Sequence, residues 1–395
     1  MRIAIDIRAL QLETQYRGVG TYVRELILKF LARQRQLVLL AWPGMKIGLE
    51  NQFLNACQLL ELPKPSSWPW AEFNGYQRDG QDKDLFFKKL AQHVDLIHFP
   101  CAQDLRYGFP WHDVGAPRLI TVHDLLGFSN PELAWSEEIL PRRLLFKVAY
   151  RKMIQHYLEC NGILTNSQFT EHMVRASLKN NLPTIRTVLL GISDRYVLPY
   201  VSQVDEYRLQ RKLPPRFILH VGGLTGAKNV EALLQATAPR CSWPFVMAGP
   251  YTEEERDALA AKYPQQQIFW LGYVDREELP MLYAAASLFA FPSLMEGFGL
   301  PVLEAMAVGT PVVCSNVASL PEVAGNAAYT VDPRNLSQLS QALYTVMNDE
   351  NLRMQMRTRG LERAQHLSWR RTADTTWMVY ESFVEEYQRR RRRRT

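Results

Sequence analysis

The sequence predicts an α/β protein made of two doubly wound domains, each a parallel sheet with helices on both faces. Short apolar runs alternate with longer amphipathic stretches along the chain, as in successive strand–helix–strand units. The pattern restarts at residues 214–217, after a polar, proline-containing stretch. With 395 residues, the chain is long enough for two cores of ordinary size.

The N-terminal half is expected to form one sheet, and residues 43–80 have no clear period and are expected to form a long loop. Its strands are expected at residues 3–7, 36–41, 94–99, 118–122, 162–165 and 186–190. Its helices are expected at residues 21–33, 84–92, 137–158 and 167–178.

The C-terminal half is expected to form a second sheet, after a linker at residues 196–215. Its strands are expected at residues 217–221, 245–248, 267–271, 287–291, 311–314 and 327–331, and a long helix at 369–387. The domains are therefore placed at residues 1–200 and 201–375, with a closing helix and arginine tail at 376–395. Two such domains facing a central cleft would bind ligands outside the carboxyl ends of their strands.

The stretch LMEGFGLPVLEA at residues 294–305 is the most informative segment of the chain. A strand, a Gly-x-Gly turn and a helix N-terminus direct backbone N–H groups at a ligand, which suits a phosphate. Glu296 and Glu304 flank that turn, and carboxylates beside a phosphate site accept hydrogen bonds from sugar hydroxyls. The structural alternative is that one glutamate interacts favourably with the helix dipole from the first turn and the other is solvated on the helix surface. Glu304 falls after the first turn, so the dipole does not account for both. The segment therefore predicts a site for a sugar nucleotide.

Glycine-rich turns follow the first strand of each predicted domain. Gly18 and Gly20 open the first helix without the third glycine of a dinucleotide-binding motif. In the second domain, Gly223 and Lys228 lie in the sequence GGLTGAKN. A lysine at a helix N-terminus can neutralise a diphosphate leaving group.

His123, at the end of a predicted strand, is a candidate for contact with a substrate hydroxyl. A lone histidine is more often structural. Asp6 and Arg8 lie at the end of the first strand and are further candidates for the site. The alternative is that they only form a salt bridge with each other. Ser167 is a good helix N-cap, which by itself accounts for its position.

The motif around Glu296 and Glu304 resembles the E-x7-E motif of the retaining glycosyltransferases of family 4, which have the GT-B fold. The likeness continues in GTPVV at residues 309–313 and LPEV at 320–323. The resemblance implies transfer of a hexose from a nucleotide diphosphate sugar to a hydroxyl of a glycan or lipid-linked acceptor, in surface polysaccharide synthesis. Overall likeness to bacterial mannosyltransferases makes GDP-mannose the first expectation for the donor.

The resemblance also implies residue roles. Lys228, His123 and Glu296 would be catalytic, and Glu304 would accept from the ribose. The nucleotide-sugar-binding set would comprise Gly18, Gly20, Gly223, Lys228, Gly249, Tyr273, Phe298, Gly299, Leu300 and Glu304. Ala227 departs from the family pattern, in which a second basic residue is common at this position. Neutralisation of the leaving group by Lys228 would then be either weaker or shared with another residue, for example Arg17.

No metal site or cofactor is expected, because the Asp-x-Asp at Asp82 and Asp84 lies at the start of a helix rather than after a strand. Lysine and helix dipoles would balance the diphosphate charge instead. The five cysteines show no C-x-x-C spacing and are expected to be reduced.

The net charge of +6 comes from six consecutive arginines at residues 389–394, expected to be a disordered end attractive to anions. A basic amphipathic stretch at 141–158 is either a surface helix of ordinary kind or a peripheral contact with an anionic membrane. With no apolar run of spanning length and no secretory signal, a cytoplasmic location is expected, with peripheral contact at the inner face of the membrane. The remaining alternatives are a non-catalytic anion- or nucleic-acid-binding protein, and another GT-B enzyme such as a phosphorylase or epimerase.

Overall fold

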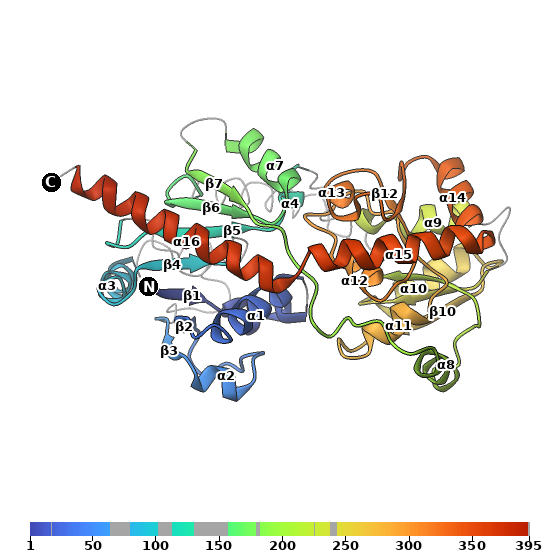
Figure 1. Ribbon diagram of the computed structural model, residues 1–395, viewed down its shortest axis with the longest axis horizontal. Coiled ribbons are helices and arrows are strands. Elements are labelled where there is room, and N and C mark those ends of the chain that lie inside the picture. The colour runs from blue at the N-terminus through green and yellow to red at the C-terminus, as the bar shows by residue number, and fades with distance from the viewer. Residues whose placement is uncertain are drawn as a thin grey trace. The chain divides into compact units, whose positions relative to one another are not determined.

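The computed structural model describes residues 1–16, 18–63, 80–101, 113–129, 157–178, 182–224, 226–237 and 243–393. The chain divides into two compact units. Unit 1 comprises the described residues of 1–128 and 157–190 together with the C-terminal segment from Trp369, and unit 2 comprises Ser129 and the described residues of 191–368. Each unit is built around its own sheet (Figure 1).

Unit 1 contains a seven-stranded parallel sheet. Its strands are β1 (Arg2–Asp6), β2 (Gln36–Ala41), β3 (Gln58–Glu61), β4 (Leu96–Phe99), β5 (Arg118–Val122), β6 (Gly162–Thr165) and β7 (Thr184–Thr187). Its helices are α1 (Gly18–Leu31), α2 (Asn51–Asn55), α3 (Gly80–Leu90), α4 (Leu126–Ser129), α7 (Gln168–Leu178) and α16 (Trp369–Arg392). The strand order is β3-β2-β1-β4-β5-β6-β7, so the direction of winding reverses between β1 and β4.

The central strands of unit 1 are buried along their whole length because helices cover both faces of the sheet. All residues of β4 and β5 are buried, as expected for a parallel sheet. One core face gathers side chains of β1, β2, β4, β5 and α3. On the other face α16 packs beside α1, where the rings of Phe30 and Trp377 lie 5.2 Å apart. The C-terminal helix is thus part of unit 1 (Figure 1).

Unit 2 contains a six-stranded parallel sheet of order β10-β9-β8-β11-β12-β13. Its strands are β8 (Ile218–Val221), β9 (Phe245–Ala248), β10 (Ile268–Gly272), β11 (Leu288–Phe291), β12 (Val312–Ser315) and β13 (Tyr329–Val331). Its helices are α8 (Val201–Gln210), α9 (Val230–Thr237), α10 (Glu253–Lys262), α11 (Leu279–Ala285), α12 (Leu300–Ala307), α13 (Leu320–Ala324), α14 (Leu336–Asn348) and α15 (Glu350–His366).

Local sequence signals mark where the helices of unit 2 begin and end. Proline occupies the second residue of α11, α12 and α13, where its missing N–H is not needed. The Thr252 hydroxyl accepts from Glu255 N at the start of α10, which satisfies one unpaired amide. After α12, Gly309 has φ +77°, the left-handed conformation that ends a helix. Gly309 was expected as this stop.

Most predicted elements are confirmed, β2 and β9 at the residues expected. Two stretches expected to be irregular contain regular elements, although residues 64–79 of the first lie outside the described residues. Residues 43–80 contain α2 and β3, and β3 adds an edge strand to the sheet through pairs such as Val38 with Gln58. The expected linker at 196–215 contains α8. These three elements, α2, β3 and α8, are short and lack apolar periodicity, so the sequence carries little signal for them.

The C-terminal arginines are another correction. They were expected to be disordered, but α16 continues through Arg392. Glu385 and Arg389 form an i,i+4 ion pair there, and arginine is a good helix former. The strand expected at 186–190 is instead at Thr184–Thr187. The helix expected at 137–158 lies almost wholly outside the described residues.

Within the part of the chain that the structure describes, none of the helices has the length and apolar content needed to cross a lipid bilayer.

Candidate functional site

The candidate site of unit 2 lies where the winding of its sheet reverses. β8 leads to β9 and β10 on one side, whereas β11 leads to β12 and β13 on the other. The two strands are neighbours, but their pairing covers only Leu288 with Ile218 and Phe289 with Leu219. Loops leaving two such strands diverge and expose a crevice at the carboxyl edge of the sheet. The glycine-rich turn after β8 and the Glu296 turn after β11 both start at this edge.

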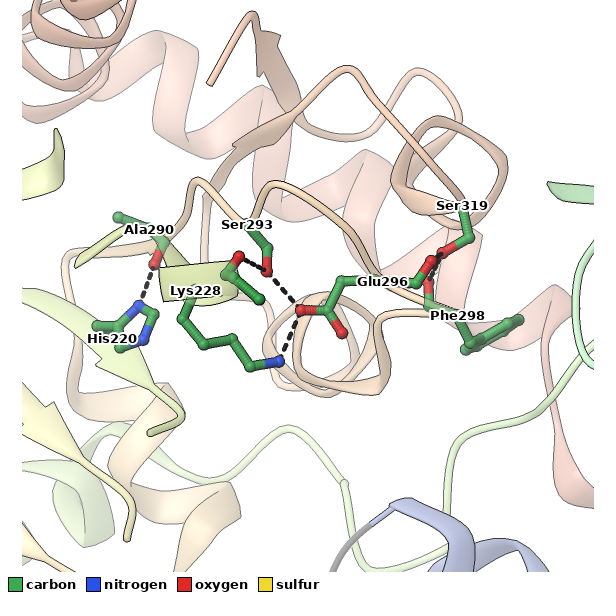
Figure 2. Close-up of polar contacts among 8 residues, drawn as sticks. His220, Lys228, Ala290, Ser293, Glu296, Phe298 and Ser319 are labelled. Atoms are coloured by element: carbon green, nitrogen blue, oxygen red, sulfur yellow. Dashed lines mark hydrogen bonds and ion pairs between the residues drawn. The ribbon is translucent and has the colours of Figure 1, made fainter. Parts of the chain in front are cut away.

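Lys228 and Glu296 meet between these two loops, although 68 residues separate them in sequence. Lys228 ends a 3-10 helix, η5 (Gly226–Lys228), and its Nζ lies 2.6 Å from Glu296 Oε1. The Ser293 hydroxyl lies 2.5 Å from the same oxygen and 3.0 Å from the Ala227 carbonyl oxygen. Figure 2 shows this cluster, with the lysine and serine converging on one carboxylate oxygen. Both partners of the ion pair are partly exposed, so a ligand can reach them.

The Glu296 turn is held in shape by Ser319, the residue before α13. Its hydroxyl lies 2.9 Å from the Glu296 carbonyl oxygen and 2.8 Å from that of Phe298 (Figure 2). Gly299 follows with φ +103°, and Leu300 starts α12. The turn therefore ends on a helix N-terminus, which is a favourable place for an anion. The predicted residues Phe298, Gly299 and Leu300 thus lie at the expected element boundary.

Glu304 lies one turn further along α12 and is held by two tyrosines. The Tyr283 hydroxyl donates to Glu304 Oε2 at 2.9 Å, and Tyr196 also donates to this carboxylate. Burial raises the pKa of Glu304, while the two tyrosine hydroxyls and the charge of Arg195 lower it. The tyrosines occupy part of the acceptor capacity of the carboxylate, which has about four lone-pair positions. The remaining positions can accept from a ligand diol.

The glycines on the other side of the switch point bring backbones into contact. Gly249 has φ +145°, and a Cβ placed on it would lie 2.2 Å from the Gly222 carbonyl oxygen. Its N–H donates to the Gly272 carbonyl oxygen at 2.8 Å. Gly223 lies next to this contact in the β8 loop, and Tyr273, which follows β10, is 55% exposed. Gly249 is therefore required by the close contact between the loops that follow β8 and β9, and Tyr273 is accessible to a ligand.

His220, a residue of β8, was not predicted from the sequence. It is fully buried, and its Nδ1 donates to the Ala290 carbonyl oxygen at 3.1 Å, where the ladder between β8 and β11 has ended (Figure 2). Burial and the nearby charge of Lys228 lower the pKa of His220 to about 4, against the opposing effect of the Ala290 carbonyl. Its Nε2 has no hydrogen-bond partner among the described residues. The ring therefore fills the gap between the diverging strands as a neutral group.

His123 of unit 1 follows β5. Its Nε2–H donates to the Pro100 carbonyl oxygen at 2.7 Å, and the ring of Tyr22 meets it edge-on at 4.9 Å. Burial lowers the pKa of His123 to about 4, against the opposing effect of the Pro100 carbonyl. The imidazole is therefore neutral near pH 7, and its Nδ1 is left as an acceptor.

The other candidates of unit 1 have structural partners. A Cβ on Gly20 would lie 2.4 Å from the Gln15 carbonyl oxygen, so this glycine is required by the chain's own backbone. Gly18 is the first residue of α1. Asp6 and Arg8 form a buried ion pair whose guanidinium also lies over Trp42. The structural alternative for that pair is thus confirmed.

Ser167 accepts from the N–H of Thr170 at 3.0 Å and caps α7 as expected. Arg17, which was expected to help Lys228, and the basic stretch at 141–156 lie outside the described residues. Ala227 is buried beneath the Lys228 turn. Across the described ranges there is no group of three or more histidine, cysteine, aspartate or glutamate residues that could hold a metal ion.

Ser293, Ser319, Tyr196 and Tyr283 complete the list of site residues that sequence reasoning missed. Ser293 had a signal, because it is a hydroxyl between the end of a strand and Glu296. Tyr196 had none, since it lies in a stretch interpreted as a linker.

Comparison with known proteins places this geometry in a family. The model of the glycosyl transferases group 1 matches residues 203–363. The O-antigen chain mannosyltransferase B of Escherichia coli is 33% identical over 273 residues, which cover 66% of this chain and 69% of that protein. The serotype-specific mannosyltransferase WbdA of Escherichia coli is 24% identical over 97% of this chain, which spans 48% of WbdA, about half its length.

Among solved structures, sucrose-phosphate synthase from Thermosynechococcus elongatus has a TM-score of 0.71 at 20% identity, covering 98% of this chain and 100% of that one. The two doubly wound parallel sheets together with this structural likeness give the chain the GT-B fold. The chain belongs to the glycosyl transferases group 1 and is a glycosyltransferase. The resemblance drawn from residues 294–323 is confirmed.

Proposed function

We propose that the protein is a retaining glycosyltransferase that moves a hexose from a nucleotide diphosphate sugar to a hydroxyl of a glycan or lipid-linked acceptor. The mannosyltransferases to which the chain is similar support mannose as the sugar and surface polysaccharide as the product. GDP-mannose is the proposed donor. The observation that carries the proposal is the meeting of Lys228, Glu296 and the α12 N-terminus at the switch point of the unit 2 sheet.

In this proposal Lys228 stabilises the diphosphate as the bond between the anomeric carbon and the phosphate oxygen breaks. Developing negative charge on the leaving oxygen is favoured by a preorganised ammonium and by the positive end of a helix. Gly223 and the backbone of Phe298, Gly299 and Leu300 line the same position. No metal ion is needed, because lysine and helix dipole supply the positive charge.

The two glutamates bind hydroxyl groups. Glu304, held by Tyr283 and Tyr196, accepts from the ribose diol, and Glu296 accepts from hydroxyls of the donor sugar. Gly249 and Tyr273 border the base, since Gly249 lets the β9 loop pack on the backbone of Gly222 and Tyr273 is exposed. Charge-assisted hydrogen bonds of this kind are stronger than neutral ones.

Unit 1 contributes His123 as the proposed catalytic contact to a substrate hydroxyl, through the Nδ1 lone pair that Pro100 leaves unused. Because its pKa is about 4, the ring accepts a hydrogen bond throughout the neutral pH range. Gly18, the first residue of α1, is the proposed point of close approach to the ligand, and Gly20 supports it by allowing α1 to pack on the backbone of Gln15.

The proposed location is cytoplasmic, with peripheral contact at the inner face of the membrane. The arginine-rich end of α16 supports this contact by its charge, because about 1 kcal/mol is gained per basic residue near an anionic surface.

Donor binding is the first test. Purified protein is screened by thermal shift against GDP-mannose, UDP-glucose, ADP-glucose and dTDP-glucose, with Glu304→Ala alongside. Stabilisation of the wild type by one nucleotide sugar but not of the variant is expected. If none of the four shifts the melting temperature, the donor proposal is wrong.

Transfer is tested separately by incubating the protein with the stabilising donor and an oligosaccharide acceptor. The anomeric configuration of the product is then read by NMR. Retention of the donor configuration is expected, and inversion would overturn the retaining assignment.

A further inference from the structure

Lys228 and Glu296 have two partners each in the proposed reaction, and they cannot serve both at once. In the structure the ammonium is 2.6 Å from the carboxylate. In the proposed complex with donor, the ammonium contacts the diphosphate and the carboxylate accepts from the sugar. The ion pair must therefore loosen or be exchanged whenever a phosphate binds.

The surroundings of Glu296 keep its carboxylate beside the phosphate position. Ser293 lies 2.5 Å from Oε1, and Ser319 holds the carbonyl oxygens of residues 296 and 298 (Figure 2). The turn is thereby tied to β11 and α13 at both ends. The carboxylate is only 14% exposed, so solvent screens it weakly.

The two ligands of the site therefore differ in what they offer Glu296. A nucleoside diphosphate without sugar takes Lys228 and leaves a carboxylate next to an anion, which is repulsive. A nucleotide diphosphate sugar takes Lys228 but brings hydroxyl donors for the carboxylate, and these replace the lost ammonium contact.

We propose that Glu296 is a specificity-determining residue that makes the site prefer the sugar-bearing donor over the bare nucleoside diphosphate, by competing with phosphate for Lys228. The inference rests on the proposed function and deepens it. After transfer the sugar hydroxyls leave with the product, Glu296 recovers Lys228, and the remaining diphosphate is bound less tightly. The ion pair therefore discriminates between the substrate, which carries the sugar, and the product, which is the bare nucleoside diphosphate.

The test compares the dissociation constants of GDP and GDP-mannose, measured by calorimetry without acceptor, for the wild type and Glu296→Gln. Glutamine keeps the shape and removes the charge. GDP is expected to bind the variant about fivefold more tightly, because the repulsion and the competition for Lys228 are gone. GDP-mannose is expected to bind it about tenfold more weakly, because neutral hydrogen bonds replace charge-assisted ones. A purely structural role would change both constants in the same direction.

Glu278→Gln is the matched control. Glu278 is also a partly buried glutamate in unit 2 that accepts from a hydroxyl, that of Tyr207, and from a cation, Arg211. Both dissociation constants are expected to stay within about twofold of the wild type. Thermal unfolding of both variants shows whether they are folded. If Glu296→Gln is unfolded, Glu296→Asp, which keeps the charge, is used in its place. GDP is then expected to bind Glu296→Asp no more tightly than the wild type.

Two results would count against the proposal in different ways. If the wild type binds both ligands and Glu296→Gln weakens both or leaves GDP unchanged, the competition is absent and the inference is wrong. If the wild type binds none of GDP-mannose, UDP-glucose, ADP-glucose and dTDP-glucose, the proposed function itself fails. Tighter GDP binding by Glu296→Gln with weaker GDP-mannose binding supports both the inference about Glu296 and the proposed function.

Discussion

Glu304 is under two opposing influences that make its charge sensitive to its neighbours. Burial favours the neutral acid, and the hydroxyls of Tyr283 and Tyr196 favour the carboxylate. Its pKa is raised by the balance of these effects. Since a ribose hydroxyl donates to the ionised form, nucleotide affinity is expected to be full above this pKa and lost as the pH falls through it.

Tyr283→Phe is therefore expected to weaken nucleotide binding most at low pH. Removing one donor to the carboxylate raises the pKa of Glu304 further, because the Tyr283 hydroxyl stabilises the ionised form. GDP affinity, measured by calorimetry from about pH 5 to about pH 8, should therefore be lost at a higher pH in the variant than in the wild type.

Tyr263→Phe is the control for that change, because the Tyr263 hydroxyl bonds Gln235 and is remote from Glu304 in sequence and contact. The GDP affinity of this variant should be lost at the same pH as that of the wild type. If Tyr283→Phe loses GDP affinity at the same pH as the wild type, Glu304 does not bind the nucleotide through its ionised form.

At the same scale, single residues show why the site was only partly predictable. Lys228 and Glu296 lie in loops that follow strands, and Glu304 lies in the helix that the second loop opens, which are local signals. That Lys228 pairs with Glu296, and that Glu304 pairs with tyrosines, depends on which strands are neighbours. His220 resembles any apolar-strand histidine in the sequence, because its role follows from the divergence of β8 and β11.

Among the elements, α12 depends on the conformation of the glycine before it. Gly299 has φ +103°, and a Cβ there would lie 2.4 Å from Leu320 Cδ2. Gly299→Ala is expected to destabilise unit 2 by about 2–3 kcal/mol, through backbone strain and the clash together. Urea denaturation measures the loss, and weaker GDP binding should accompany it because the α12 N-terminus is displaced.

Gly272→Ala separates strain from clash. Gly272 also has a positive φ, +66°, but a Cβ placed on it would have no atom of the described residues within 4 Å beyond its own chain neighbours. Its cost should be about 1 kcal/mol. Equal losses in the two variants would mean that the contact with Leu320 is unimportant.

The closing helix α16 is held to unit 1 by a buried polar chain. The Tyr380 hydroxyl lies 2.6 Å from His98 Nδ1, and His98 Nε2 lies 2.7 Å from the Thr121 hydroxyl, which in turn lies 3.2 Å from that of Tyr22. Burial, with a smaller effect of His123, lowers the pKa of His98 to about 3, so the ring is neutral. Tyr380 is also fully buried.

Tyr380→Phe is expected to destabilise unit 1 by about 1–3 kcal/mol, because it leaves a buried imidazole nitrogen without its partner. Hydrogen exchange of the β4 and β5 amides in the full chain reports the change. Tyr344→Phe, at a tyrosine that is 44% exposed, should have little effect. Unchanged protection in Tyr380→Phe would show that the polar chain contributes no stability.

For the molecule as a whole, the C-terminal arginines determine the net charge. The chain carries a net charge of +6 with them and is balanced without them. Their contacts are peripheral, since Arg389 pairs with Glu385 on the helix surface, whereas the last large core residue of α16 is Phe383. The arginines can thus be removed without opening the core.

Deletion of residues 389–395 is expected to leave the kcat/KM of transfer unchanged while weakening binding to vesicles that contain an anionic lipid. The loss should amount to at least tenfold at low salt and shrink as salt is added, because screening suppresses surface attraction. Co-sedimentation measures it, and vesicles of neutral lipid are the control. Equal sedimentation of the full and shortened chains would assign any membrane contact to another part of the protein.

The sequence alone was enough to predict the α/β class, two doubly wound domains, most strands and helices, the family, and the positions of Lys228, Glu296 and Glu304. These follow from hydrophobic period, turn residues and short motifs, which act over a few residues. The folded chain was needed to show that Lys228 is paired with Glu296, that Tyr196 and Tyr283 hold Glu304, and that α16 belongs to the N-terminal unit. Those contacts join residues distant in sequence, and strand order and helix packing, which no local pattern encodes, bring them together.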